Sequence, residues 1–266
     1  MICFSSLLKT APEYKSAAEE LFDALISAGI DYSFVDNTKD VWLRDYMPVA
    51  TKNGKYISFR YEPSYLKEYP DLKTNFRDIA DSLPISVTYS DINLDGGNIV
   101  FSPGREKAVI SDRVFAENPE CTESEIISEL ENLLEAKIII IPSLKSDMTG
   151  HADGVVRFVD ENTVIGNRTP YRNGYEQKVK RVLNKHGISV LDFPYYSSRG
   201  ISAAGCYLNY LETESHIFLP SFGAPEDNEA FRCAEAIFDK TIVAVPFSEI
   251  AEHGGVLNCI SWERTA

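Results

Sequence analysis

The chain has 266 residues, of which 44% are hydrophobic and 25% are charged, so it has the composition of one large or two small globular domains and not of a disordered or fibrous protein. The 26 Lys and Arg residues against 40 Asp and Glu residues give a formal net charge of −14, which disfavours nucleic acid and anionic membranes as partners. The longest aliphatic run, Ile138 to Ile141, is far too short to span a bilayer. The five cysteines form no CxxC pair and the N-terminus lacks a signal-peptide pattern, so we expect a cytoplasmic protein without a disulfide framework.

The first predicted helix begins at a capping box, Thr10-x-x-Glu13, and can end at Gly29 in a left-handed conformation. A strand over 32–35 and a hairpin over 49–59, turning at Asn53-Gly54, come next. The elements expected after them are a helix over 71–83, a strand over 85–89, a hairpin over 99–110, a helix beginning at the capping box Thr122-x-x-Glu125, a strand over 137–141, a hairpin over 155–165, a helix over 175–186, a strand over 188–191, a hairpin over 207–218, a helix over 226–239 and a strand over 241–245. A last strand over 256–261 is expected to pair with residues 2–5.

These elements recur at a nearly constant spacing. The predicted helices begin near residues 11, 71, 123, 175 and 226, so the chain divides into five tandem units of roughly 50 residues, each a hairpin, a helix and a strand. No linker or low-complexity segment interrupts the series. The pattern predicts a single α/β domain, residues 1–266, folded as a five-bladed, pseudo-fivefold α/β propeller. An ordinary α/β fold with alternating strands and helices is the alternative.

A polar motif lies just beyond the last strand of each unit. The five motifs contain Asp45, Asp95, His151 with Asp153, Asn209 and Cys259. In a closed ring, equivalent positions face one axis, so these side chains would converge while neighbouring glycines allow close backbone approach. Taken singly, these motifs also have simpler explanations. Asp45 beside Arg44 fits a surface ion pair, Asp95-Gly96-Gly97 fits a turn, and Cys259 fits an inert core thiol. His151-x-Asp153 could be a metal-ligand pair, but no further His or Cys with ligand spacing accompanies it.

The ordered motifs resemble those of a known enzyme family. The series WLRD, LDGG, GHADG, SAAGCYLNY, LPSFGAPED and GGVLNC, from about Trp42 to Cys259, is similar to the agmatine deiminase and bacterial-type peptidylarginine deiminase family of guanidino-group-modifying enzymes. The resemblance implies the pentein fold, a five-bladed α/β propeller. It also implies a hydrolase of C–N bonds that converts a guanidino substrate, above all agmatine to N-carbamoylputrescine, and releases ammonia.

The resemblance assigns roles to residues at matching positions. Cys259 would be the nucleophile that forms a covalent thiouronium, and His151 would transfer protons. Asp45 and Asp153 would hold the guanidinium by charge-assisted hydrogen bonds. No metal and no organic cofactor would be needed.

Three further residues are assigned to substrate binding: Asp95, Asn209 and Trp42. Two positions depart from the family pattern, since Asn258 stands directly before the nucleophile where many members have His, and Trp262 stands shortly after it in place of glutamines. These departures bear on the distal part of the substrate pocket more than on the guanidinium chemistry.

The sequence leaves several alternatives open. The substrate could instead be free arginine or arginine at a peptide terminus. An arginine carboxylate would require a cation, and the candidate cations are Arg44, Arg157, Arg168, Arg172 and Arg199. An amidinotransferase, in which an amine resolves the covalent intermediate, and a non-catalytic binding module are the other classes. The expected partner is a small cationic guanidino compound or an arginyl peptide, and the oligomeric state is left undetermined.

Overall fold

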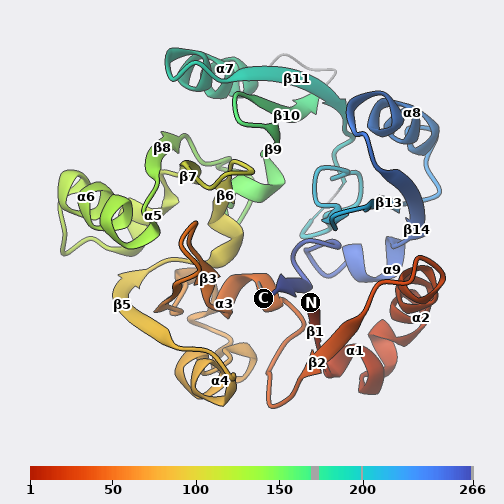
Figure 1. The fold of residues 1–266 in the computed structure, drawn as a ribbon, viewed down its shortest axis with the longest axis horizontal. Helices are drawn as coiled ribbons and strands as arrows, with labels where there is room; N and C mark the ends of the chain where they lie inside the picture. Colours follow the sequence, from red (N-terminus) through yellow and green to blue (C-terminus); the bar gives the residue numbers. More distant parts are fainter. Residues whose placement is uncertain (169–173, 199, 265–266) are drawn as a thin grey trace.

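The structure is a computed structural model that describes residues 1–168, 174–198 and 200–264. The described residues form five three-stranded sheets, and Figure 1 shows them around a common centre with most helices on the outside. In sheet order the strands are β3 (Val49–Ala50), β4 (Tyr56–Arg60) and β5 (Val87–Asn93); β6 (Ile99–Phe101), β7 (Lys107–Ser111) and β8 (Lys137–Ile141); β9 (Val156–Asp160), β10 (Thr163–Arg168) and β11 (Ser189–Pro194); β12 (Leu211–Glu212), β13 (His216–Ser221) and β14 (Thr241–Pro246); and β15 (Ser261–Glu263), β1 (Ile2–Ser5) and β2 (Tyr32–Val35).

Each sheet repeats one topology. An antiparallel pair is followed by a third strand that lies parallel to the middle strand, as in β6, β7 and β8. A parallel neighbour requires a crossover connection, which a helix supplies in every unit. The helices are α1 (Leu7–Thr10), α2 (Pro12–Ser27), α3 (Leu43–Tyr46), α4 (Phe76–Ser82), α5 (Arg113–Glu117), α6 (Glu123–Leu134), α7 (Tyr175–Lys185), α8 (Asp227–Ile237) and α9 (Ser248–Ala251).

The two ends of the chain meet in the fifth sheet. Residue Ile2 of β1 pairs with Glu263 of β15 in antiparallel register. The expected strand over 256–261 is therefore wrong in its bounds, because only Ser261 belongs to a strand and the residues before it, Cys259 included, form turns. The expected pairing of the last segment with residues 2–5 is confirmed.

Two helix starts differ from the sequence expectation. Thr10 ends α1, and its hydroxyl donates to the Ser6 carbonyl, so the predicted capping box at Thr10 is wrong and α2 begins with Pro12 at its first position. The predicted helix over 71–83 begins only at Phe76, since the Asn75 side chain accepts hydrogen bonds from two backbone N–H groups of the first turn.

Other local predictions are confirmed. The Thr122 hydroxyl accepts from the backbone N–H of Glu125, whose carboxylate in turn accepts from the backbone N–H of Thr122. Gly29 has φ 68 and ends α2, and Gly54 has φ 76 in the turn between β3 and β4. The hairpin expected over 207–218 is shorter than predicted, because residues 207–210 form a turn and β12 begins at Leu211.

The core lies between each sheet and the helices that cover it. Helix α6 buries Ile126, Leu130 and Leu134 against apolar side chains of the second sheet. Burying a side chain of this size stabilises the fold by about 1.5–3 kcal/mol, which fixes the outer helices on the sheets. Short 3-10 turns, η3 (Gly96–Asn98) and η4 (Ala152–Gly154), then lead into the strands β6 and β9. Across residues 1–168, 174–198 and 200–264, no helix has both the length and the apolar character needed to cross a membrane.

Candidate active site

The residues singled out from the sequence occupy one equivalent position in the five sheets. Each lies in a turn or a short helix that precedes the first strand of its sheet. In chain order these are Asp45 before β3, Asp95 before β6, His151 and Asp153 before β9, Asn209 before β12, and Cys259 before β15. Hydrogen bonds between these turns connect residues that are 50 to 106 positions apart in the sequence. The structure therefore brings these side chains, which occupy equivalent positions of the five units, close to one another, as the sequence predicted.

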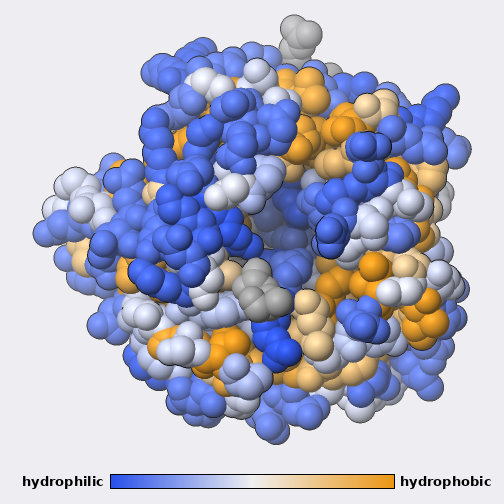
Figure 2. Space-filling view, viewed as in Figure 1, coloured by the Kyte–Doolittle hydropathy of each residue, from blue (hydrophilic) through white to orange (hydrophobic). Residues whose placement is uncertain are grey.

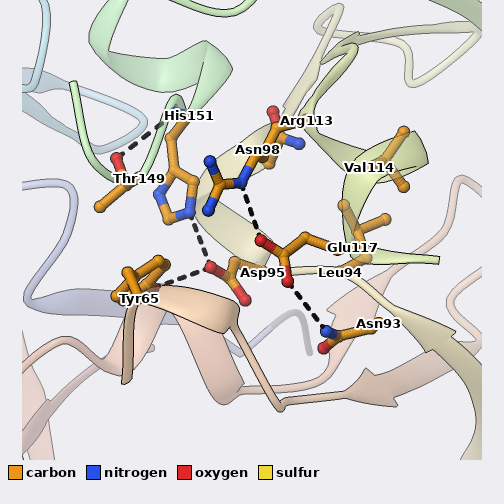
Figure 3. A pocket seen from close by; sticks show the side chains of 10 residues that line it. All are labelled: Tyr65, Asn93, Leu94, Asp95, Asn98, Arg113, Val114, Glu117, Thr149 and His151. Atoms are coloured by element: carbon orange, nitrogen blue, oxygen red, sulfur yellow. Dashed lines mark hydrogen bonds and ion pairs between the residues drawn. The ribbon is translucent and has the colours of Figure 1, made fainter. Parts of the chain in front are cut away.

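One part of the site surrounds the imidazole of His151. The Nε2 atom lies 2.8 Å from Asp95 Oδ2 and the Nδ1 atom lies 3.6 Å from Asp45 Oδ1. The hydroxyl of Tyr65 donates to the same Asp95 Oδ2 over 2.8 Å, as Figure 3 shows. All three charged side chains are about nine-tenths buried, so these contacts act with little screening by water.

The carboxylates keep His151 protonated. Burial alone would lower the pKa of His151, but the negative charges of Asp45 and Asp95, with a smaller effect of Asp153, raise it to about 10. The pKa of Asp45 is also raised, chiefly by burial and despite the opposing charge of His151. At neutral pH His151 is thus an imidazolium that can donate a proton.

A second part of the site surrounds the thiol of Cys259. Asp153 Oδ2 accepts hydrogen bonds from Asn258 Nδ2 at 2.7 Å and from Asn209 Nδ2 at 3.2 Å, and it lies 3.9 Å from Cys259 Sγ. The backbone N–H of Cys259 donates to Asn209 Oδ1 at 3.1 Å. The two asparagines therefore fix the carboxylate and the nucleophile candidate relative to each other.

The thiol is protonated while no cation is bound. Burial, and then the negative charges of Asp153 and Asp45, raise the pKa of Cys259 well above its ordinary value. A positive group placed between these carboxylates would offset their charge and lower the pKa of the thiol. The site is consequently arranged so that a bound cation favours formation of the thiolate.

Glycines make room for these contacts at two positions. A Cβ atom on Gly97 would lie 2.5 Å from Asp45 Oδ1 and 2.7 Å from His151 Nδ1. A Cβ atom on Gly255 would lie 2.7 Å from Cε3 of Trp42 and 3.0 Å from Cβ of Cys259. The half-buried indole of Trp42 and the cysteine thus approach the same glycine, which places Trp42 at the edge of the site.

The arginines considered for a distal carboxylate are engaged elsewhere. Arg44 Nη2 lies 2.7 Å from Glu263 Oε1, and Arg157 Nη2 lies 3.8 Å from Glu212 Oε2. Arg168 is half-exposed and pairs with Glu229 at 2.8 Å. The other two candidates, Arg172 and Arg199, lie outside the described residues.

Several contacts at the site were not found by the sequence reasoning. Tyr65 belongs to a short 3-10 helix, η1 (Ser64–Leu66), in an irregular segment that carries no repeat signal. Asn258 was noted only as a departure from a family pattern, yet its position directly before Cys259 was an available signal for its contact with Asp153. Within the described ranges, no three His, Cys, Asp or Glu side chains are grouped so that they could hold a metal ion.

Comparison with known proteins supports the resemblance noted in the sequence. The family model described as Porphyromonas-type peptidyl-arginine deiminase matches residues 6–264. An agmatine deiminase of Stutzerimonas stutzeri is 36% identical over 81 residues, which is 30% of this chain and only 22% of that relative.

Solved structures show the same fold at low sequence identity. A variant of the C. jejuni agmatine deiminase with substrate bound aligns with a TM-score of 0.79 at 17% identity and covers 99% of this chain and 92% of that one. A dimethylarginine dimethylaminohydrolase (DDAH) of Pseudomonas aeruginosa aligns with a TM-score of 0.63 at 14% identity and covers 98% of this chain and 97% of that one. The mixed α/β fold is therefore that of these enzymes.

Proposed function

The chain belongs to the Porphyromonas-type peptidyl-arginine deiminase family, and from this premise we propose that it is a hydrolytic deiminase of a small guanidino substrate, with agmatine preferred. The observation that carries the proposal is the placement of three buried carboxylates, Asp45, Asp95 and Asp153, with a protonated imidazole and the thiol of Cys259 in one site. A guanidinium is the small group whose charge and planar N–H donors match carboxylates of this kind. The agmatine deiminase of C. jejuni with substrate bound has the same fold.

We assign the catalytic steps to residues by their contacts. Asp153 and Asp45 hold the guanidinium, whose charge favours loss of the Cys259 proton to solvent water. The thiolate attacks the central carbon, and His151 donates its proton to the departing nitrogen, so that ammonia leaves and a C–S bond remains. Water then attacks the thiouronium carbon and gives a proton to His151, the C–S bond breaks, and the ureido product and free Cys259 are formed.

Three residues complete the proposed substrate site. Asp95 orients His151 through the 2.8 Å contact to Nε2, and it presents a third negative charge to the cation. Asn209 fixes Asp153 and the backbone of Cys259. The indole of Trp42 covers one side of the site beside Gly255.

We also propose an overall architecture and a cellular location for the protein. We propose that the five sheets form a five-bladed pseudo-fivefold propeller and that residues 1–266 are a single domain, because one repeated topology closes through β1 and β15. A cytoplasmic location is supported by five cysteines that are all free thiols.

Agmatine is favoured over arginine as the substrate because the candidate arginine side chains that the structure describes are already paired with glutamates. Among the described candidates, Arg44, Arg157 and Arg168 each already contact a glutamate, so none of them is available to a substrate carboxylate without losing that contact. Agmatine carries an amine in place of the carboxylate and needs no such cation.

A substrate panel tests the proposal. Ammonia release is measured with agmatine, free arginine and a short arginyl peptide, with Cys259→Ala as the control that keeps the carboxylates. We expect release from agmatine by the wild-type protein and none by the variant. Release from the peptide alone would instead support a peptidylarginine deiminase. Transfer of the amidino group to an added amine without ammonia, seen by mass spectrometry, would show an amidinotransferase, and absence of both reactions would refute enzymatic activity on guanidines.

A further inference from the structure

Arg44 contacts the segment that carries the nucleophile, although none of the proposed catalytic steps uses it. Arg44 lies in α3, directly before the substrate-binding candidate Asp45. Its backbone N–H donates to the Cys259 carbonyl at 3.0 Å, and its Nε donates to the Asn258 carbonyl at 3.3 Å. Its Nη2 donates to Ser261 Oγ, also at 3.3 Å. One residue therefore binds a segment that lies 214 to 217 positions further along the chain.

The turn around Cys259 depends on such contacts because it belongs to no helix or strand. The backbone N–H of Cys259 donates to Asn209 Oδ1 at 3.1 Å, and its carbonyl accepts from the backbone N–H of Arg44. Without a ladder of regular hydrogen bonds, these bonds decide where the thiol lies. Displacing a reacting group by ~1 Å can lower a rate by about 100-fold, so the contacts of Arg44 bear on catalysis.

The positive charge of Arg44 acts on the thiol as well. Burial alone would lower the pKa of Arg44, but the negative charge of Glu263 raises it. The charges of Asp153 and of an ionised Cys259 raise it further, by smaller amounts. Electrostatic interaction is mutual, so Arg44 in turn favours the thiolate of Cys259. Asp153 and Asp45 oppose this effect and outweigh it in the free protein, where the pKa of the thiol is raised.

Glu263 does not cancel the charge of Arg44. The Nη2 atom of Arg44 lies 2.7 Å from Glu263 Oε1, but the side chain of the glutamate is 37% exposed and that of the arginine only 18%. Both line a cavity of about 260 Å³, which has room for several water molecules. Figure 2 shows a hollow at the centre of the molecule with hydrophilic side chains around it. The other charged side chains of the lining are Asp153, Arg105, Arg157 and Glu212. Because the carboxylate of Glu263 is more exposed, water screens its charge more than that of the guanidinium.

We propose that Arg44 is a positioning residue of the reaction, which fixes the turn that carries Cys259 and stabilises its thiolate by charge. This role rests on the proposed deiminase function, and it is distinct from substrate binding, because Arg44 repels a guanidinium by its like charge. Arg44 therefore contributes to the rate and not to substrate affinity. Asp153 and Asp45 have the opposite signs, since they attract the substrate and disfavour the thiolate.

Two substitutions separate the position of Arg44 from its charge. Arg44→Lys keeps the charge but loses the planar group that reaches Asn258 and Ser261 together. Arg44→Gln loses the charge. Arg77→Gln is the matched control, since it removes the positive charge of a half-exposed side chain that lies 4.0 Å from Asp91 on the surface.

Alkylation of Cys259 by iodoacetamide is measured against pH without ligand, and mass spectrometry distinguishes this thiol from the other cysteines. We expect the thiol to titrate about 1 pH unit higher in Arg44→Gln, and close to the wild type in Arg44→Lys and Arg77→Gln. In the agmatine assay, kcat should be about 10- to 100-fold lower in both Arg44 variants, with KM changed by less than about threefold. Agmatine affinity in a Cys259→Ala background, measured by calorimetry, should be unchanged or higher in Arg44→Gln because a repelling charge is lost.

Three results would overturn the role of Arg44. They are an unchanged thiol titration in Arg44→Gln, a wild-type kcat in either Arg44 variant, and an agmatine affinity weaker by more than about tenfold, which would show general damage to the site. If Arg44→Gln does not fold by circular dichroism, Glu263→Gln replaces it. This variant keeps Arg44 and removes the opposing carboxylate, so the thiol should titrate at lower pH, and an unchanged titration refutes the charge effect. If the wild type releases no ammonia, the deiminase function is refuted, and the thiol titration, which needs no turnover, still decides whether Arg44 stabilises the thiolate.

Discussion

Replacing Asp153 by asparagine removes one buried charge and leaves the shape of the site intact. Asp153 Oδ2 accepts hydrogen bonds from Asn258 and Asn209, and an amide oxygen at the same position can accept both. The carboxylate also lies 3.9 Å from Cys259 Sγ. The variant therefore tests what the negative charge does to a bound cation and to the thiol.

The effect on a bound cation follows from Coulomb's law. Opposite unit charges ~4 Å apart attract by about 4 kcal/mol at an effective dielectric of 20, against about 1 kcal/mol in water. Part of this attraction is offset because a neutral amide costs less to desolvate, so we expect a loss of about 2–4 kcal/mol, or roughly 30- to 1,000-fold in agmatine affinity. Calorimetry in a Cys259→Ala background measures the affinity without turnover.

The effect on the thiol has the opposite sign. The charge of Asp153 raises the pKa of Cys259, so Asp153→Asn should lower that pKa and allow the thiolate to form at lower pH. The rate of alkylation by iodoacetamide, measured against pH without ligand, reports the thiolate. Asp91→Asn is the control, because this side chain is 98% exposed. Unchanged agmatine affinity, or a thiol that titrates at higher pH in Asp153→Asn, would refute the electrostatic account of the site.

Three further perturbations test other parts of the structure. Asp95→Asn removes the carboxylate nearest His151 Nε2, so the pKa of His151 should fall from about 10 and the alkaline limb of the kcat/KM profile, which reports the free enzyme, should move to lower pH. Gly255→Ala places a methyl group against the indole of Trp42. This overpacking should reduce the free energy of unfolding by about 1–3 kcal/mol, which lowers the unfolding midpoint in urea, and it should also lower kcat. Thr122→Ala should destabilise the fold by about 0.5–2 kcal/mol in urea because it breaks an observed capping box, whereas Thr10→Ala should change stability by less than about 0.5 kcal/mol.

Each of these perturbations has a result that would count against it. An alkaline limb that stays in place in Asp95→Asn would mean that the carboxylate does not set the pKa of His151. Gly154→Ala is the control for Gly255→Ala, because a Cβ there meets no atom within 4 Å, and equal losses in both variants would show that the close approach to the indole is unimportant. Equal destabilisation by the two threonine variants would contradict the capping geometry.

The pH dependence of stability has a defined sign for His151. Its pKa in the folded state, about 10, lies above the value of ~6.5 expected in the unfolded chain. The contribution of this group to the free energy of unfolding is therefore complete below pH ~6.5 and disappears as the pH rises through 10.

The order of elements could be predicted from the sequence because its signals are local. The capping box at Thr122, the turn at Gly54 and the helix end at Gly29 each depend on residues within a few positions, and each is confirmed. The signal at Thr10 failed because the preceding residues form their own short helix, α1, so that the hydroxyl donates to Ser6 instead.

The sequence also indicated which residues would meet, because the motifs occupy the same position in each of the five repeated units. It did not determine which residue would contact which. His151 and Asp153 are two positions apart, yet the imidazole lies against Asp95 and Asp45 while the carboxylate of Asp153 faces Cys259. These pairings depend on how the five sheets are arranged around their common centre. That arrangement is decided by the packing of elements far apart in the chain, in particular the pairing of Ile2 with Glu263, and no local sequence pattern encodes it.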